Sequence, residues 1–143
     1  MDYYYINTEA KNFGGKSPDK IWLKERSAFV SGEEYGPKLG RLNPGDICFM
    51  YVNGCGVVAV GKVLEHWSGQ RSEPPRVYTD PQDPIPEYRI SVDWFLTFQH
   101  NPISARVLRD IVGWTSSQAM QRITNQEAAE RLLHYARQQS DHS

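Results

Sequence analysis

The chain has 143 residues, of which 39% are hydrophobic and 12% aromatic, and its formal net charge is −1. This length suits one hydrophobic core, so we expect residues 1–143 to fold as a single domain. A charge this close to zero excludes a protein that holds nucleic acid mainly through its phosphates, because such proteins are strongly basic. Any nucleic-acid binding must therefore combine local positive charge with a pocket.

The two cysteines, Cys48 and Cys55, are too few for a disulfide framework, and their spacing suits no zinc site. Both lie in apolar stretches, so we expect buried thiols, a reducing compartment and a cytoplasmic location. The chain does not open with a basic segment and an apolar run, which predicts no signal peptide. The longest apolar stretches, 47–52 and 57–60, are too short to span a membrane.

The first part of the chain predicts one strand followed by irregular structure. Residues 3–6 are aromatic and β-branched, which is typical of a strand. Residues 7–20 are rich in polar and turn-forming residues and indicate a loop. The segment 21–30 fits either a short helix or an irregular chain that lines a groove. The glycines and the proline of residues 32–40 argue against a long element there.

The central part of the chain predicts a β-hairpin. Residues 47–52 are apolar on both faces, which indicates a buried strand. Asn53-Gly54 is a strong hairpin signal, and the partner strand returns over residues 57–64. Gly56 and Gly61 indicate a bulge or a close approach of the backbone, which barrels use for bending.

A long loop and a second strand region follow the hairpin. Residues 68–87 form a proline-rich loop whose length is typical of functional loops. Residues 88–98 then alternate between apolar and polar, with Phe95 as the exception. This pattern predicts one half-buried strand, on which Trp94 and Phe98 share the apolar face.

Two helices are predicted in the last part of the chain. Asn101-Pro102 is typical of a helix start, and Gly113 can end that helix. Thr124 with Glu127 is a capping box for a last helix that runs through Gln139. The fold class is therefore expected to be α+β and mainly β, with a small β-barrel and short peripheral helices.

Four stretches resemble the EVE domain, a family of the PUA-like superfamily that is related to YTH and ASCH domains. Residues 4–9, Tyr-Tyr-Ile-Asn-Thr-Glu, resemble the family's opening strand, although Ala10 replaces the proline found there. Residues 42–63 resemble its central hairpin. Residues 88–108 resemble the later strand and helix of EVE and YTH domains, and residues 123–132 match the closing helix. The resemblance covers nearly the whole chain and rests on the order and spacing of these pieces.

The resemblance implies an EVE-type, PUA-like β-barrel. YTH domains bind methylated adenine of RNA in an aromatic cage, and some EVE relatives bind modified cytosine of DNA in bacterial defence systems. We therefore expect a reader domain that recognises a methylated or hydroxymethylated base, flipped out of DNA or RNA into an aromatic pocket. The expected partner is nucleic acid, together with an effector protein, and no cofactor or metal is expected.

A base pocket needs flat apolar walls and a few polar groups for the edge of the base. Trp67 opens the long loop, at a place that matches a cage tryptophan of YTH domains, although loop tryptophans also commonly cap the edge of a core. Trp22, Phe29 and Tyr35 lie where the family has its other cage ring, and the sequence does not choose among them. We expect Trp67 and at least one of these three rings to converge on one cavity.

Polar and basic residues complete the expected site. Asn7, Thr8 and Glu9 follow the first strand and either bond the edge of the base or serve only as turn residues. Trp94 is expected in the core. A positive rim for phosphates is expected from residues that are individually ordinary surface residues: Lys16, Lys20, Lys24, Arg26, Lys38 and Arg41.

Two other functions stay open. The chain has no nucleophile motif, paired carboxylates, phosphate loop or metal triad, so we expect no enzyme. The related ASCH domains nevertheless include hydrolases that use a lysine and a glutamate. Lys20, Lys24 and Glu9 supply these groups for an ASCH-like small hydrolase acting on a modified nucleoside or an amide. A barrel without an effector domain could also serve as an adaptor for a protein partner.

Overall fold

The computed structural model describes residues 1–8, 18–77 and 85–141. In chain order the elements are β1 (Tyr3–Asn7), α1 (Pro18–Glu25), β2 (Ser27–Ser31), the 3₁₀ helix η1 (Gly36–Arg41), β3 (Ile47–Val52), β4 (Gly56–Val63), β5 (Glu87–Thr97), α2 (Ala105–Ile111), β6 (Met120–Ile123) and α3 (Gln126–Asp141).

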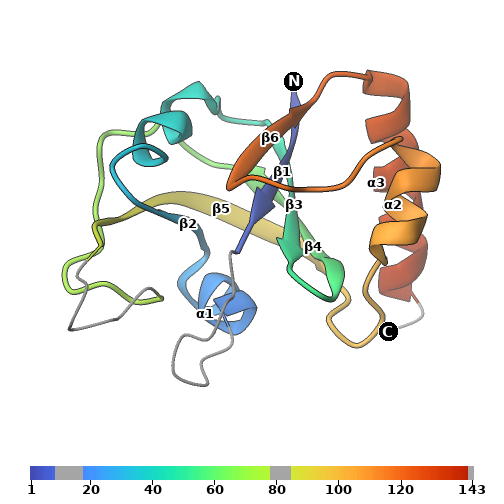
Figure 1. Ribbon diagram of the computed structural model, residues 1–143, viewed down its shortest axis with the longest axis horizontal. Coiled ribbons are helices and arrows are strands. Elements are labelled where there is room, and N and C mark those ends of the chain that lie inside the picture. Colours follow the sequence, from blue (N-terminus) through green and yellow to red (C-terminus); the bar gives the residue numbers. More distant parts are fainter. Residues whose placement is uncertain (9–17, 78–84, 142–143) are drawn as a thin grey trace.

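The strands form one mixed sheet in the order β2-β5-β4-β3-β1-β6. β1 runs parallel to β3, and the other neighbouring pairs are antiparallel. The long β5 crosses the molecule, with α1 beside β2 and the pair α2 and α3 on the far side (Figure 1). The mainly β fold with peripheral helices is confirmed. In the described part of the chain, however, β2 and β6 remain unpaired edges, so the sheet is a half barrel.

The hairpin expected around Asn53-Gly54 is confirmed, because β3 and β4 are adjacent and antiparallel. Gly56 has a φ of +118°, and a Cβ there would collide with the backbone of Ile103. A Cβ on Gly61 would collide with the side chains of Val92 and Trp94. Both glycines are therefore sites of close approach, as their place in the strand predicted.

β5 does not keep one apolar face along its length. Its register against β4 shifts between Trp94 and Leu96, which leaves Phe95 as an extra residue. One extra residue reverses the alternation of side chains beyond it. Trp94 therefore packs on one core, whereas Leu96 and Phe98 pack in the other. The expectation that Trp94 and Phe98 share a face is wrong for this reason.

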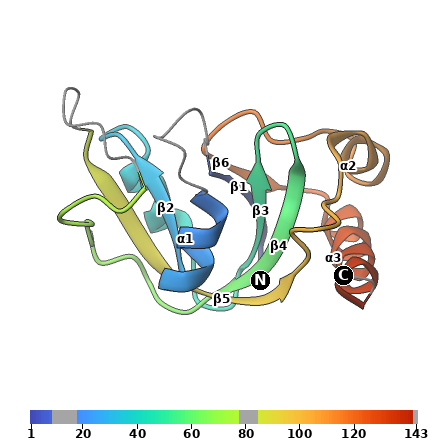
Figure 2. The ribbon, with the colours of Figure 1, turned by 90° about the horizontal axis from the view of Figure 1, so that it is seen from below.

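Two hydrophobic cores lie on the two faces of the sheet, and β1 supplies both. Tyr4 and Ile6 point into the inner core, which also holds Trp22 of α1. Tyr3 and Tyr5 point into the outer core, which packs against α2 and α3. This division follows from the period of a strand, in which successive side chains point to opposite faces. Figure 2 shows the two groups of helices on either side of the β3–β4 hairpin.

The ambiguous segment 21–30 contains the end of a helix and a strand. α1 ends at Glu25, and β2 begins at Ser27. Arg26 between them has a φ of +51°, in the left-handed region that ends helices. After this residue the chain turns and pairs with β5.

The start predicted for α2 at Asn101-Pro102 is wrong. Ile103 instead pairs with Val57 of β4, donating its N–H and accepting one in return, each at 2.9 Å. This pairing binds the segment to the sheet, so the helix begins only after Ser104, whose Oγ accepts a backbone N–H of the first turn at 3.3 Å. Gly113, with a φ of +97°, follows the helix as predicted.

The last part of the chain holds a strand that the sequence did not indicate. β6 is short and pairs antiparallel with β1. It is a strand because of this pairing, since its own sequence has no clear apolar–polar alternation. α3 is capped by Asn125, whose Oδ1 accepts the N–H of Ala128 at 3.1 Å. The cap predicted from Thr124 and Glu127 is thus placed one residue too early.

The two thiols differ in environment. Cys48 is buried in the inner core, and burial raises the pKa of its thiol. Cys55 lies in the turn between β3 and β4 and is exposed, so the expectation that both thiols are buried is wrong for Cys55. In the described residues, no helix is both long and apolar enough to cross a membrane.

Candidate nucleic-acid interface

Trp67 lies half-buried between η1 and the start of β5. Its ring meets the ring of Tyr88 edge to face, with centroids 5.8 Å apart. η1 approaches both rings through glycines, since a Cβ on Gly36 would collide with Tyr88 and one on Gly40 would lie 3.8 Å from Trp67. The Trp67 Nε1 is buried and has no hydrogen-bond partner in the described parts of the chain. An unmet buried donor of this kind costs about 1–3 kcal/mol.

Two cations lie over tyrosine rings, one at the start of η1 and one at the ring that meets Trp67. The Lys38 Nζ is 4.9 Å from the ring centroid of Tyr35, and the Arg71 guanidinium is 5.6 Å from that of Tyr88. Tyr35 directly precedes η1, and the loop after β4 runs next to η1 (Figure 1). We call Tyr35, Lys38, Trp67, Arg71 and Tyr88 the aromatic–basic cluster. Rings beside positive charge are the chemistry that holds a nucleotide, through stacking and phosphate contacts.

Trp22 and Phe29, the other two candidate walls, are fully buried in the inner core. The ring centroid of Trp22 is 6.1 Å from those of Phe29 and Trp94. Trp94 is half-buried and donates its Nε1 to the carbonyl of Ser27 at 3.1 Å. Trp22 and Phe29 thus expose no face to a ligand in this structure, whereas Tyr35 is half-buried and directly precedes η1, the helix that lies beside Trp67.

Arg89 covers the side of the buried ring group. Its guanidinium lies 5.0 Å from the ring centroid of Phe29, and its Nη2 donates to the Ser27 Oγ at 2.9 Å. The Glu25 carboxylate is 3.8 Å from Arg89 and 3.2 Å from Arg76. Through these contacts Arg89 of β5 binds to the end of α1 and to β2.

Asn7 and Thr8 lie at the end of β1, where both are buried. The Asn7 Nδ2 donates to the Ser116 Oγ at 3.3 Å, which ties this end to the segment before β6. The start of the same strand lies near η1, because the Tyr4 hydroxyl donates to the carbonyl of Arg41 at 3.5 Å. With a rise of about 3.3 Å per residue, these two ends are roughly 10 Å apart. Asn7 and Thr8 are therefore not brought to the aromatic–basic cluster, and Glu9 lies outside the described residues.

The basic residues expected at a positive rim fall into two groups. Lys20 and Lys24 are exposed on α1, and exposed Arg26 follows them. Lys38 and Arg41 lie in η1, and Lys38 belongs to the aromatic–basic cluster. Lys16 lies outside the described residues.

The sequence does not single out Tyr88 or Arg71. Tyr88 falls on the apolar face predicted for residues 88–98, and Arg71 falls in the long loop of residues 68–87. In the structure an isolated β-bridge joins the two residues. The available signal was the place of Tyr88, an aromatic residue that begins a strand directly after a long loop.

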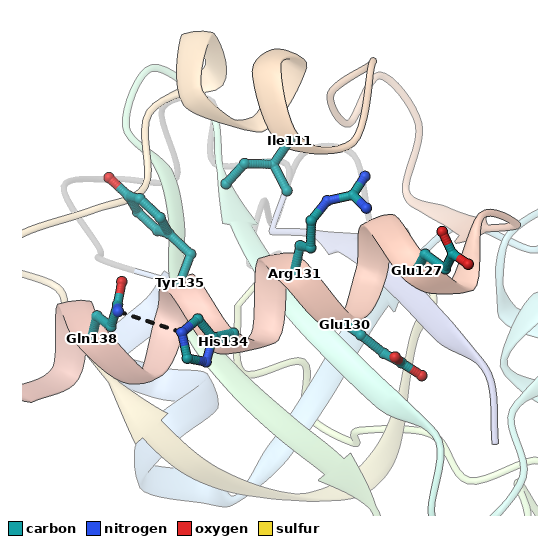
Figure 3. Close-up of a pocket in the computed structure, with 7 residues that line it drawn as sticks. All are labelled: Ile111, Glu127, Glu130, Arg131, His134, Tyr135 and Gln138. Atoms are coloured by element: carbon teal, nitrogen blue, oxygen red, sulfur yellow. Dashed lines mark hydrogen bonds between the residues drawn. The ribbon is translucent and has the colours of Figure 1, made fainter.

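A separate hollow of about 600 Å³ lies between α2 and α3 (Figure 3). Ile111 of α2 faces Arg131 and Tyr135 of α3 across it. Glu127 and Glu130 offset the basic residues there, and these helices cover the outer core, away from Trp67. The hollow therefore lies on the opposite face of the sheet from Trp67 and holds one aromatic ring, that of Tyr135. In the described chain, no group of three His, Cys, Asp or Glu side chains is placed to hold a metal ion.

No family model and no curated protein matches this chain. Solved structures do match. The YTH domain of Pho92 in complex with m6A shares 15% identity over 94% of this chain and 85% of its own, with a TM-score of 0.65. The Toxoplasma CPSF4 YTH domain, in complex with a 7-mer m6A-modified RNA, shares 11% identity over 96% and 91%, with a TM-score of 0.59. Protein PSPTO5229 from Pseudomonas syringae shares 15% identity over 94% and 99%, with a TM-score of 0.56.

These similarities establish the architecture. The curled six-stranded sheet with its short helices is the YTH-like fold. At such low identity they establish the fold alone.

Proposed function

We propose that this chain is a non-catalytic reader domain of the EVE and YTH kind, which binds a modified base of nucleic acid. Its fold, shared with YTH domains solved in complex with m6A, supports the proposal. The observation that carries it is the half-buried Trp67, which meets the ring of Tyr88 and leaves part of its own ring exposed. Lys38 and Arg71 beside it supply charge for phosphates.

In this proposal the flipped base stacks on Trp67 and meets Tyr88 at the bottom of the site. Stacking contributes about 1–3 kcal/mol per base, and a methyl or hydroxymethyl group adds area for the rings to cover. Flipping a paired base costs a few kcal/mol, so a single strand should bind better than a duplex. We further propose a cytoplasmic location and an effector protein as a second partner.

The test is a binding screen with single-stranded DNA and RNA that carry cytosine or adenine, each unmodified, methylated or hydroxymethylated. Fluorescence anisotropy at two salt concentrations separates pocket binding from phosphate binding, because only the latter weakens steeply with salt. A reader should prefer one modification at both concentrations. Equal affinity for all strands overturns the proposal, and release of a product from a modified nucleoside or amide indicates the hydrolase instead.

Lys38→Gln and Arg71→Gln provide a second measurement on the same strands. Each phosphate contact contributes about 0.7 to the slope of log affinity against log salt for a single strand. Each variant should therefore lower this slope by roughly that amount and leave the preference for the modification intact. Lys62→Gln is the matched control, since Lys62 is exposed on β4, where it pairs in register with Asp93 of β5.

A further inference from the structure

A second cavity, of about 290 Å³, lies beside the aromatic–basic cluster. Residues 71–75 and 85–87 line it, so Arg71 borders both the cavity and the cluster. Tyr88, which meets Trp67, directly follows the residues that close the cavity. A strand bound at Trp67 thus has this cavity within reach of its next nucleotide.

Buried hydrogen bonds hold the walls of the cavity in place. The Glu87 carboxylate is buried and accepts the backbone N–H groups of Arg76 and Val77 at 2.7 and 2.8 Å. The Ser72 N–H donates to the Glu87 carbonyl at 2.9 Å, and the Gly32 N–H donates to the Pro86 carbonyl at 2.8 Å. These bonds therefore hold residues 72, 76 and 77 to Glu87 of β5, and Pro86 to the residue that follows β2.

The lining of the cavity combines apolar walls with one unmet polar group. Pro74, Pro75 and Pro86 supply rigid apolar surface, and Ile85 adds an aliphatic side chain that is 39% exposed. Ser72 is only 6% exposed, and its Oγ has no hydrogen-bond partner in the described residues. A serine hydroxyl both donates and accepts, so it can bond the edge of any base.

We infer that this cavity is a second nucleotide subsite, which takes the neighbour of the modified base; the inference rests on the proposed function. The neighbouring base packs on Ile85 and the prolines, and the Ser72 hydroxyl turns about χ1 to bond the edge of the base. The phosphate between the two nucleotides meets Arg71. The subsite accepts an unmodified base, because apolar walls and one hydroxyl do not select a modification.

Glu73 competes with a bound phosphate for Arg71. The Arg71 Nε is 3.6 Å from the Glu73 carboxylate, and both side chains are at least half exposed. A phosphate must share Arg71 with this carboxylate or displace it. Glu73→Gln should therefore tighten binding of a strand several-fold at low salt, and the gain should shrink at high salt.

The experiment compares a modified nucleoside with a hexanucleotide that contains it, by titration calorimetry. The parent should bind the hexanucleotide roughly tenfold more tightly than the nucleoside. Ile85→Ser and Ser72→Ala should lose most of this gain. Leu64→Ser is the matched control, because Leu64 is 54% exposed and does not line the cavity, and it should keep the gain.

The outcomes separate the subsite from the reader function. If both cavity variants bind the hexanucleotide as tightly as the parent, the subsite is overturned and the reader function stands. If the parent binds modified and unmodified strands equally but the variants lose affinity, the subsite stands and the reader function is overturned. If no strand binds, both are overturned.

Discussion

The ring of Trp67 meets the ring of Tyr88 at an interplanar angle of 78°, although the two residues belong to different ends of a long loop. The loop returns to the sheet beside its own start, because Arg71 bridges to Tyr88 and Glu87 holds the backbone of residues 76–77. Trp67 is thereby fixed on one side by β5 and on the other by η1.

Replacing Trp67 with Ala should weaken binding of a modified strand about tenfold or more, because it removes a stacking surface worth roughly 1–3 kcal/mol. Trp22→Ala should act on stability instead, lowering the free energy of unfolding by about 3–5 kcal/mol, since Trp22 is fully buried. Calorimetric titration and urea unfolding of both variants measure the two effects.

The contrast between the two tryptophans decides the assignment. If Trp67→Ala binds modified strands as well as the parent does, Trp67 is only a cover for the core. If it unfolds as readily as Trp22→Ala, a loss of affinity would say nothing about stacking. Trp67→Phe, which keeps a smaller ring at the same place, then tests the stacking surface in a variant that fills more of the site than alanine does.

Gly56→Ala and Gly61→Ala should each lower the free energy of unfolding by about 1–3 kcal/mol, because neither position has room for a Cβ. Gly56 carries the additional cost of its φ of +118°. Gly40→Ala is the control, since the nearest atom to its Cβ lies at 3.8 Å and no unusual φ is required. Equal midpoints of urea unfolding for all three variants would contradict the close approach seen at β4.

The sequence predicted the parts of the fold that local pattern decides. The β3–β4 hairpin followed from two apolar runs around Asn53-Gly54, and the close contacts of Gly56 and Gly61 followed from glycine in a strand. β6 and the bulge near Phe95 depend on a partner strand, and no local pattern encodes a partner. The late start of α2 has the same cause, since Ile103 is held by Val57.

The site was harder to predict than the fold. The resemblance predicts Trp67 and the local charge predicts Lys38, and the structure places Lys38 in η1 and Trp67 beside it. Phe29 and Trp22 have the same residue types as cage walls but lie in the core, because burial depends on three-dimensional packing. Tyr88 joins Trp67 only through the return of the loop, which alternation along a strand does not reveal.

The two cysteines should differ in reactivity. Cys55 is exposed and should react with an aromatic disulfide reagent in the native protein, whereas Cys48 should react only on unfolding. Burial also raises the pKa of Cys48, so little reactive thiolate forms there at neutral pH. Cys55→Ser should abolish the fast reaction seen by absorbance. A fast reaction that persists in Cys55→Ser would mean that the inner core opens readily.

The buried tyrosines of β1 should make the fold sensitive to alkali. Burial raises the pKa of Tyr5 above its ordinary value, and its hydroxyl donates to the Trp114 carbonyl at 3.1 Å. Tyr3 and Tyr4 have a raised pKa for the same main reason. Above a pH of about 10 the unfolded chain releases these protons while the folded chain keeps them, so the free energy of unfolding falls. The stabilisation that comes with these raised pKa values is complete below that pH and is lost as the pH rises through the folded-state pKa.

Tyr5→Phe isolates the contribution of one hydroxyl to this alkaline loss. At neutral pH the free energy of unfolding of the variant should be lower by about 1 kcal/mol, because the hydrogen bond to the Trp114 carbonyl is lost. Above a pH of about 10, its free energy of unfolding should fall less steeply than that of the parent, by up to roughly 1.4 kcal/mol per pH unit. Urea unfolding from neutral pH to about 11 measures both slopes. Parallel curves for Tyr5→Phe and the parent would show that Tyr5 ionises as readily in the folded chain as in the unfolded one.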